Sequence, residues 1–151
     1  MSWVTKGFMF LLLVLITIQF IQPTRNKSRQ ASRMDITRVF PVPEKINGIL
    51  KNSCYDCHSN NTRYPWYAML QPGGWLLASH IKKGKQELNF NEFGSYSRRR
   101  QQSKLKSIGN SIKDETMPLS SYTLIHRSAK LSQTERDLVT NWVEQMRYSL
   151  L

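Results

Sequence analysis

The sequence predicts a small all-α domain, and three observations support this prediction. Apolar residues recur at helical spacing in four segments of the chain. Breaks that contain proline, glycine or runs of polar residues separate these segments. One segment begins with a pattern that is typical of a helix N-terminus. The predicted helices cover residues 44–54, 75–88, 97–114 and 132–148.

The first two predicted helices are defined by their breaks and their apolar stripes. Pro43 suits a first helical position, and Glu44 is favoured at the positive end of the helix dipole. The break Pro72-Gly73-Gly74 precedes the second helix. The inward-facing residues of the two helices are Ile46, Ile49 and Leu50 in the first and Leu77, Ile81, Gly84 and Leu88 in the second.

The last two predicted helices follow a basic run and a capping box. Residues 98–100 are three arginines, which we expect on a solvated helix face. Residues 120–126 are expected to form a surface connection. Ser132 and Glu135 have the spacing of a capping box, and the helix that follows should pack across the first helix. The inward-facing residues are Leu105, Ile108 and Ile112, then Leu138, Val139, Trp142, Val143 and Met146.

An apolar segment occupies the N-terminus. Its dense part, residues 8–21, is about 14 residues long, which is short for a membrane span and typical of a signal peptide. With residues 3–7 it reaches about 19 residues, enough to cross a bilayer if Lys6 extends to the headgroups. No small-x-small cleavage pattern follows, so an uncleaved transmembrane helix is preferred. The predicted organisation is an anchor or signal segment over 1–22, a basic tether over 23–40 and one domain over 41–151.

The chain is strongly basic, with 22 Lys and Arg against 10 Asp and Glu and a formal net charge of +12. Such a surface favours anionic partners, including acidic redox proteins and phospholipid headgroups. No nucleic-acid-binding motif accompanies the charge, so no nucleic-acid partner is expected. Arg25, Lys27, Arg29 and Arg33 follow the apolar segment and outnumber Lys6 before it. By the positive-inside tendency alone, the domain would face the cytoplasm.

Both cysteines of the chain lie in the C-x-x-C-H motif of residues 54–58. This motif is the signature of covalent haem attachment. Two thiols on one helical turn can add across two vinyl groups at one porphyrin edge and form thioethers. The following imidazole can then ligate the iron from below. The motif predicts one haem c per chain, with Cys54 and Cys57 as its thioether residues and His58 as the proximal iron ligand.

Three other uses of the cysteine pair compete with haem attachment. A dithiol redox centre is expected after a hydrophobic strand, whereas residues 46–51 predict a helix. A zinc site needs a second close pair of ligands, and His80 and His126 are isolated in the sequence. A disulfide between residues three positions apart removes little chain entropy. Haem attachment is therefore the preferred interpretation.

The remaining features of the predicted site concern its ligands. Met117 is followed by a proline, which restricts the loop, and its soft thioether suits the distal position on haem iron. His80 lies at the edge of the second helix's inner stripe, where a hydrogen-bonded pocket residue is more typical than a ligand. The second nitrogen of His58 is expected to bond to a carbonyl of Pro65 or Pro72.

Taken together, these residues resemble the single-haem "haem-binding domain" proteins of bacteria and, more broadly, small class I cytochromes c. The resemblance covers about residues 41–148 and implies an all-α, cytochrome c-like domain around one covalent haem, in the periplasm or at the outer face of the inner membrane. It also implies a haem-pocket role for His80, as a propionate hydrogen bond or a ligand contact. It is carried by Cys54-Tyr55-Asp56-Cys57-His58-Ser59, Tyr64-Pro65-Trp66-Tyr67, Trp75, His80, Gly84, Asn89-Phe90, Met117-Pro118-Leu119, Tyr122, His126 and Trp142.

The functional prediction is electron transfer rather than catalysis. A haem held by His58 and Met117 leaves no free iron position for a substrate. The expected protein is a single-pass inner-membrane protein whose haem domain faces the periplasm, where c-type haem is attached, against the positive-inside tendency. Its expected partners are redox proteins with acidic surfaces. The alternatives are a haem sensor or small haem enzyme with an open sixth position, and a C-x-x-C thiol oxidoreductase.

Overall fold

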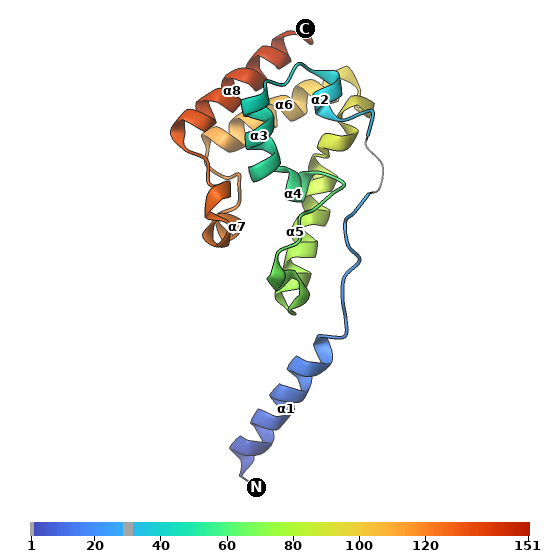
Figure 1. The fold of residues 1–151 in the computed structure, drawn as a ribbon, viewed down its shortest axis with the longest axis vertical. Helices are drawn as coiled ribbons and strands as arrows, with labels where there is room; N and C mark the ends of the chain where they lie inside the picture. The colour runs from blue at the N-terminus through green and yellow to red at the C-terminus, as the bar shows by residue number, and fades with distance from the viewer. Residues whose placement is uncertain (1, 29–31) are drawn as a thin grey trace.

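The computed structural model describes residues 2–28 and 32–151, and these residues form helices joined by loops (Figure 1). The described part contains no strand, only an isolated antiparallel bridge between Lys27 and Asn61. The all-α prediction is therefore confirmed. The elements in chain order are α1 (Trp3–Ile18), α2 (Ile36–Val39), α3 (Glu44–Ser53), α4 (Tyr55–His58), η1 (Trp66–Met69), α5 (Gly73–Glu87), η2 (Phe90–Ser95), α6 (Arg98–Lys113), α7 (Ser120–Ile125), η3 (Arg127–Ala129) and α8 (Gln133–Tyr148).

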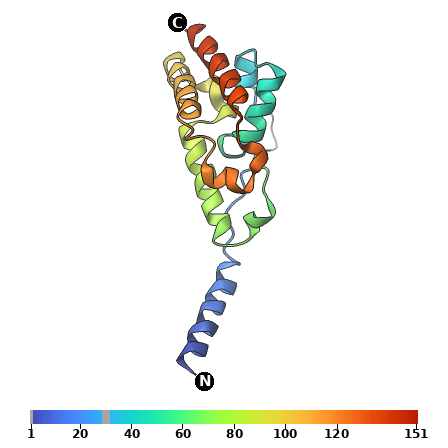
Figure 2. The same ribbon diagram turned by 90° about the vertical axis from the view of Figure 1, so that its left-hand side faces the viewer.

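Helix α1 projects away from the other helices in both ribbon views (Figures 1 and 2). It contains 16 residues, and none of them is buried. Its apolar side chains therefore lack a protein partner within the described part of the chain. Among the described residues, no helix has both the length and the apolar character that crossing a bilayer requires.

The main core lies between α3, α6, α8 and the short elements α2 and η2. Helices α6 and α8 lie against each other, and Gly109 permits a close contact: a Cβ there would sit 3.3 Å from Cγ2 of Val143. Helix α8 also contacts α3, as predicted, although α6 is its principal partner. The fully or almost fully buried side chains of this core include Ile36, Leu50, Phe90, Phe93, Leu105, Val139, Trp142 and Val143.

The predicted start of the last helix is confirmed in detail. The Ser132 hydroxyl accepts the backbone N–H of Glu135 at 3.3 Å, and the Glu135 carboxylate accepts the backbone N–H of Ser132 at 2.8 Å. These reciprocal bonds satisfy N–H groups that the helix itself leaves without partners. The four long predicted helices correspond to α3, α5, α6 and α8.

The segment predicted as a basic tether differs from a free linker in its second half. Asp35 caps α2, its carboxylate accepting the backbone N–H of Thr37 at 2.9 Å. Ile36 is completely buried, and Phe40 packs edge-on against Phe93 with ring centroids 5.9 Å apart. Burial of these two side chains makes Ile36 and Phe40 part of the core. Arg29, one of the basic residues of this segment, lies outside the described residues.

Candidate haem site

The C-x-x-C-H motif forms a single helical turn. Helix α3 ends at Ser53, and Cys54 interrupts the helix with φ −127° and ψ −40° before α4 begins. The carbonyl of Cys54 accepts the backbone N–H of His58 at 2.9 Å and that of Cys57 at 3.2 Å. The two thiols and the imidazole therefore come from one compact turn, as the motif predicts.

A glycine lets helix α5 pass directly over this turn. A Cβ at Gly84 would lie 2.8 Å from the carbonyl oxygen of Cys57 and 3.3 Å from its Cβ. The first distance is shorter than carbon and backbone oxygen atoms tolerate, so a side chain at this position would force α4 and α5 apart. Gly84 thus fixes how closely the haem motif approaches α5.

The imidazole of His58 is oriented by the residue that follows α5. Its Nδ1 lies 3.0 Å from the carbonyl oxygen of Leu88. A carbonyl accepts only from a protonated nitrogen, so Nδ1–H donates and Nε2 keeps its lone pair for a metal. The expectation that Pro65 or Pro72 supplies this carbonyl is wrong, because the carbonyl of Leu88, directly after α5, accepts from Nδ1.

The environment of His58 favours its neutral form. Burial lowers the pKa of His58, and this effect outweighs the opposing hydrogen bonds to the carbonyls of Leu88 and Gly84. The ring of Phe90 meets the imidazole edge-on, with centroids 6.2 Å apart. Neutral imidazole is the form that ligates iron.

All five residues predicted for the site line one cavity of about 370 Å³. Cys54, Cys57 and His58 come from the α3–α4 region, His80 from α5, and Met117 from the loop between α6 and α7. A volume of this order is typical of cofactor and ligand pockets. The other residues that line the cavity are Ser53, Asp56, Leu77, Lys83, Gly84, Glu87, Pro118, Leu119 and Tyr122.

A second cavity of about 240 Å³ adjoins the first. The two share six lining residues, including Cys54, His58 and Met117. Helix α6 closes the second cavity with side chains from Lys104 to Ile112. Helix α6 therefore takes part in the site, whereas no α8 residue lines either cavity. The sequence did not decide which of these helices would reach the cofactor.

A larger cavity of about 740 Å³ lies on another face of α5, between residues 23–26 and 78–92. None of the five predicted site residues lines it. Size alone would favour this cavity, but the chemistry of the donor atoms favours the one that holds both thiols and the imidazole.

The two thiols have the wrong electrostatics for a redox-active dithiol. They do not form a disulfide. Burial raises the pKa of Cys54 to about 12, with a smaller contribution from Cys57. Burial, with the charge of Asp56, raises the pKa of Cys57 to about 11. Thiol oxidoreductases need a thiolate of lowered pKa, so this environment opposes the oxidoreductase alternative.

Met117 and His80 reach the cavity in different ways. The backbone N–H of Met117 donates to the carbonyl of Ser111 at 3.2 Å, which turns the loop back onto the end of α6. The side chain of Met117 is 38% exposed, so the cavity opens to solvent beside it. His80 lies on α5 one turn before Gly84 and is half-buried. Among residues 2–28 and 32–151, no group of three or more His, Cys, Asp or Glu side chains could hold a metal ion on its own.

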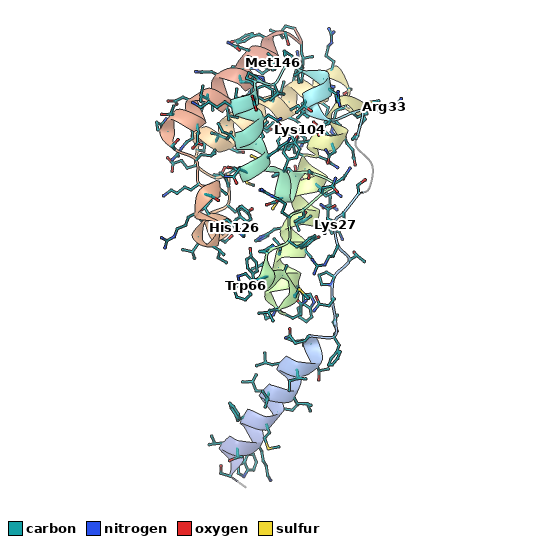
Figure 3. All side chains as sticks on the ribbon, in the orientation of Figure 1. Lys27, Arg33, Trp66, Lys104, His126 and Met146 are labelled. Atoms are coloured by element: carbon teal, nitrogen blue, oxygen red, sulfur yellow. The ribbon has the colours of Figure 1, made fainter. Side chains whose placement is uncertain are left out.

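A polar network that the sequence did not reveal ties α7 to the motif. Asp56, inside the motif, is almost fully buried and accepts the hydroxyl of Tyr122 at 2.8 Å and the backbone N–H of Arg63 at 3.0 Å. His126 stacks on Tyr122 with centroids 4.3 Å apart, and its Nε2 lies 2.8 Å from the hydroxyl of Tyr67. Figure 3 shows His126 on the side of the α7 segment that faces α5. The surface connection expected over residues 120–126 contains a helix, Ser120–Ile125. These residues carry no apolar stripe, so the periodicity of the sequence did not indicate it.

The donor set and its surroundings fit a haem. A neutral imidazole, a thioether and two thiols share a cavity whose exposed surface is mainly apolar, although Asp56, Lys83 and Glu87 also line it. An all-α domain with this arrangement defines a haem-binding protein.

Comparison with known proteins gives the same class. The haem-binding domain family matches residues 13–145, which include every residue of the cavity, and the chain belongs to this family. No curated protein and no solved structure gives a significant match. Family membership supports haem as the cofactor.

Proposed function

We propose that this protein is a c-type haem protein that carries single electrons between redox partners. The observation that supports this most directly is the shared cavity of Cys54, Cys57, His58 and Met117. In this proposal the two thiols form thioethers, Nε2 of His58 is the proximal ligand and the thioether of Met117 is the distal ligand. Bound haem would supply a one-electron centre at the iron.

The residues around the cavity support electron transfer better than catalysis. Ligands on both faces would leave no iron position for a substrate. Leu88 and Phe90 contact the imidazole, and Leu77 lines the same cavity; these apolar groups limit water and help to set the reduction potential. The hydrogen bond from His58 to Leu88 would raise the basicity of the proximal ligand.

The test of covalent attachment uses the full chain, produced together with a c-type maturation system. We expect one haem per chain by pyridine haemochrome analysis, and the haem should stay with the polypeptide after denaturation. The double variant Cys54→Ala/Cys57→Ala should lose this covalent haem. His126→Ala is the matched control and should keep it, since His126 does not line the cavity. Free thiols at Cys54 and Cys57 in the matured protein would reject the proposal.

The proposed partners are redox proteins with acidic surfaces. The net charge of +12 supports this, and Lys83 contributes positive charge at the cavity wall, whereas Lys104 is paired with Glu87 at 3.5 Å. Electrostatic steering raises association rates and is screened by salt. We therefore expect the electron-transfer rate with an acidic acceptor to fall steeply with ionic strength, while a basic acceptor reacts slowly. Equal rates with both acceptors would contradict this choice of partner.

We also propose that residues 2–22 attach the protein to the bacterial inner membrane, with the haem domain in the periplasm. The support is an apolar helix with no buried residue, joined to a domain with a c-type motif. The full chain should remain with membranes after carbonate extraction, and a variant lacking residues 2–22 should be released. A C-terminal alkaline phosphatase fusion should be active, because that enzyme folds only in the periplasm. An inactive fusion would place the domain in the cytoplasm.

A haem sensor or small haem enzyme is the second candidate. The partial exposure of Met117 favours it, since a solvent-accessible distal ligand can be displaced. In that case the reduced protein should bind carbon monoxide without denaturant. Absence of binding would favour electron transfer.

A further inference from the structure

We infer that the tip of the domain, defined as residues 66–71, contacts the lipid headgroup region together with Phe20 and Ile21. The protein would then touch the membrane at two points, the inserted α1 and this tip. The inference rests on the proposed membrane attachment and adds a second contact that the anchor alone does not require.

The tip is bonded directly to the end of α1. The side-chain amide of Gln19 makes two hydrogen bonds to the backbone of Gln71: its oxygen accepts the N–H at 2.9 Å, and its nitrogen donates to the carbonyl at 3.2 Å. The amide of Gln22 donates to the carbonyl of Met69 at 3.1 Å. If α1 enters the bilayer, these bonds hold the tip at the depth where α1 leaves it.

Further contacts make this junction rigid. Gln71 is buried, and its side-chain nitrogen donates to the amide oxygen of Gln22 at 3.1 Å. The indole N–H of Trp75 donates to the carbonyl of Ile21 at 2.8 Å. A Cβ at Gly74 would lie 2.5 Å from the carbonyl oxygen of Ala68, so η1 packs tightly on the start of α5. The tip and the end of α1 are therefore expected to move as one unit.

The surface of this unit is unusually apolar for a region that faces water. Five large apolar side chains belong to the segment that follows α1 and to the segment from Trp66, at the start of η1, to Leu70. The ribbon views show these two segments side by side (Figures 1 and 2). Figure 3 shows Trp66 at the end of the domain nearest α1. Tryptophan is enriched at membrane interfaces because its ring is apolar and its N–H is polar. The exposed fractions are 84% for Phe20, 59% for Ile21, 77% for Trp66, 60% for Met69 and 52% for Leu70.

The charges around the tip favour contact with an anionic membrane surface. Residues 1–34 and 57–86 contain no Asp or Glu. A basic side chain lies near the tip: the guanidinium of Arg25 lies over the ring of Tyr64, 4.7 Å from its centroid, whereas Arg63 is paired with Asp56. Basic residues next to an inserted segment are attracted to the negative headgroups of the membrane surface.

Two contacts would fix the orientation of the haem domain on the membrane. Helix α5 runs from the tip to the cavity, and at 1.5 Å per residue His80 lies about 10 Å from Gly73 along the helix. The domain would not turn freely on a flexible linker, and its cavity would stay at a constant height above the headgroups. Partners would then reach it from a limited range of directions.

The test labels the full haem-loaded chain in vesicles of phosphatidylethanolamine and phosphatidylglycerol. A lipid that carries a diazirine near the glycerol end of its acyl chain is photolysed, and labelled residues are mapped by mass spectrometry. We expect label in residues 3–21 and in residues 66–71. The internal control is the C-terminal end, where Tyr148 and Leu151 are 62% and 87% exposed at the opposite end of the molecule from α1. Their labelling should be several-fold lower.

Two variants separate this inference from the proposed anchor. Met69→Asp/Leu70→Asp should reduce label in the tip several-fold and leave label in α1 unchanged, whereas Leu151→Asp should change neither. Label in α1 without label in residues 66–71 overturns the inference and leaves the anchor intact. Absence of label in both segments overturns both proposals. Equal label at the tip and at residues 148–151 also overturns the inference, because it shows that lipid reaches both surfaces by random encounter and that the tip has no defined membrane contact.

Discussion

Nδ1 of His58 lies 3.0 Å from the carbonyl oxygen of Leu88, thirty residues further along the chain. The backbone N–H of Leu88 in turn donates to the carbonyl of Gly84 at 2.9 Å. One turn at the end of α5 therefore does two things. Gly84 gives the motif room to approach, and Leu88 orients its imidazole. The geometry of the proposed proximal ligand depends on α5 as much as on the motif.

Substitution of Gly84 should disturb the motif without changing any ligand. In Gly84→Ala the new methyl group meets the carbonyl oxygen of Cys57, so α4 must shift. We expect a loss of about 1–3 kcal/mol in the free energy of unfolding, as for other overpacked contacts. The yield of covalent haem should fall as well. Urea unfolding and haem quantification measure the two effects.

Gly48→Ala provides the matched control. Gly48 lies inside α3, and a Cβ there would meet no atom within 4 Å. Alanine should stabilise that helix by about 0.5–1 kcal/mol and leave haem yield unchanged. If both variants behave alike, the close contact between α5 and Cys57 has no structural role.

The choice of distal ligand can be read from absorption spectra. The ferric protein should show the charge-transfer band of a methionine–iron bond. This band should vanish in Met117→Ala, and the reduction potential should fall, because the thioether favours reduced iron. His80→Ala should keep the band, since in this assignment His80 contacts the pocket without ligating iron. Survival of the band in Met117→Ala would transfer the distal position to another residue.

The parts of the site that local sequence specifies were predictable. The motif residues lie on one turn because C-x-x-C-H is a local pattern, and the capping box at Ser132 needs only a four-residue window. The four long helices follow from apolar periodicity for the same reason. Their ends agree within a few residues.

The parts that depend on tertiary contacts were not predictable. The carbonyl that accepts from His58 belongs to Leu88 because α5 passes beside α4, and no spacing in the sequence encodes that approach. Helix α7 has no buried residue, and the hydroxyl of Tyr122 ties it to Asp56, so its sequence lacks an apolar stripe. Ile36 enters the core from a basic segment whose composition resembles a linker.

The bond between Tyr122 and Asp56 should stabilise the wall of the cavity. Tyr122→Phe removes the hydroxyl and leaves the ring that stacks on His126. Hydrogen bonds to a charged group contribute about 1.5–3 kcal/mol when buried, and half-burial reduces this, so we expect a loss of roughly 1–2 kcal/mol. Hydrogen exchange of residues 120–125 should accelerate. Tyr148→Phe, at an exposed tyrosine, should change neither quantity, and an equal response of both variants would reject the role of Asp56.

The capping box makes a pH-dependent contribution to stability. The backbone N–H and the hydroxyl of Ser132 both donate to the Glu135 carboxylate, and these bonds lower the pKa of Glu135 below its ordinary 4.5. A carboxylate whose folded pKa is depressed stabilises the native state above its unfolded pKa, and the stabilisation is lost as the pH falls through the folded pKa. At pH 7, Glu135→Gln should therefore cost roughly 0.3–1 kcal/mol, a small value because solvent screens the partly exposed carboxylate.

At a pH below the folded pKa of Glu135 the wild type and Glu135→Gln should unfold at the same urea concentration, because both side chains are then neutral. Ser132→Ala should behave differently. In the wild type, the Ser132 hydroxyl accepts the backbone N–H of Glu135 at any pH. The variant should therefore lose about 1 kcal/mol in the free energy of unfolding, and part of this loss should persist under acid conditions. Urea unfolding followed by circular dichroism at several pH values separates the two variants. A constant difference between wild type and Glu135→Gln across this range would show that the Glu135 charge contributes nothing to the cap.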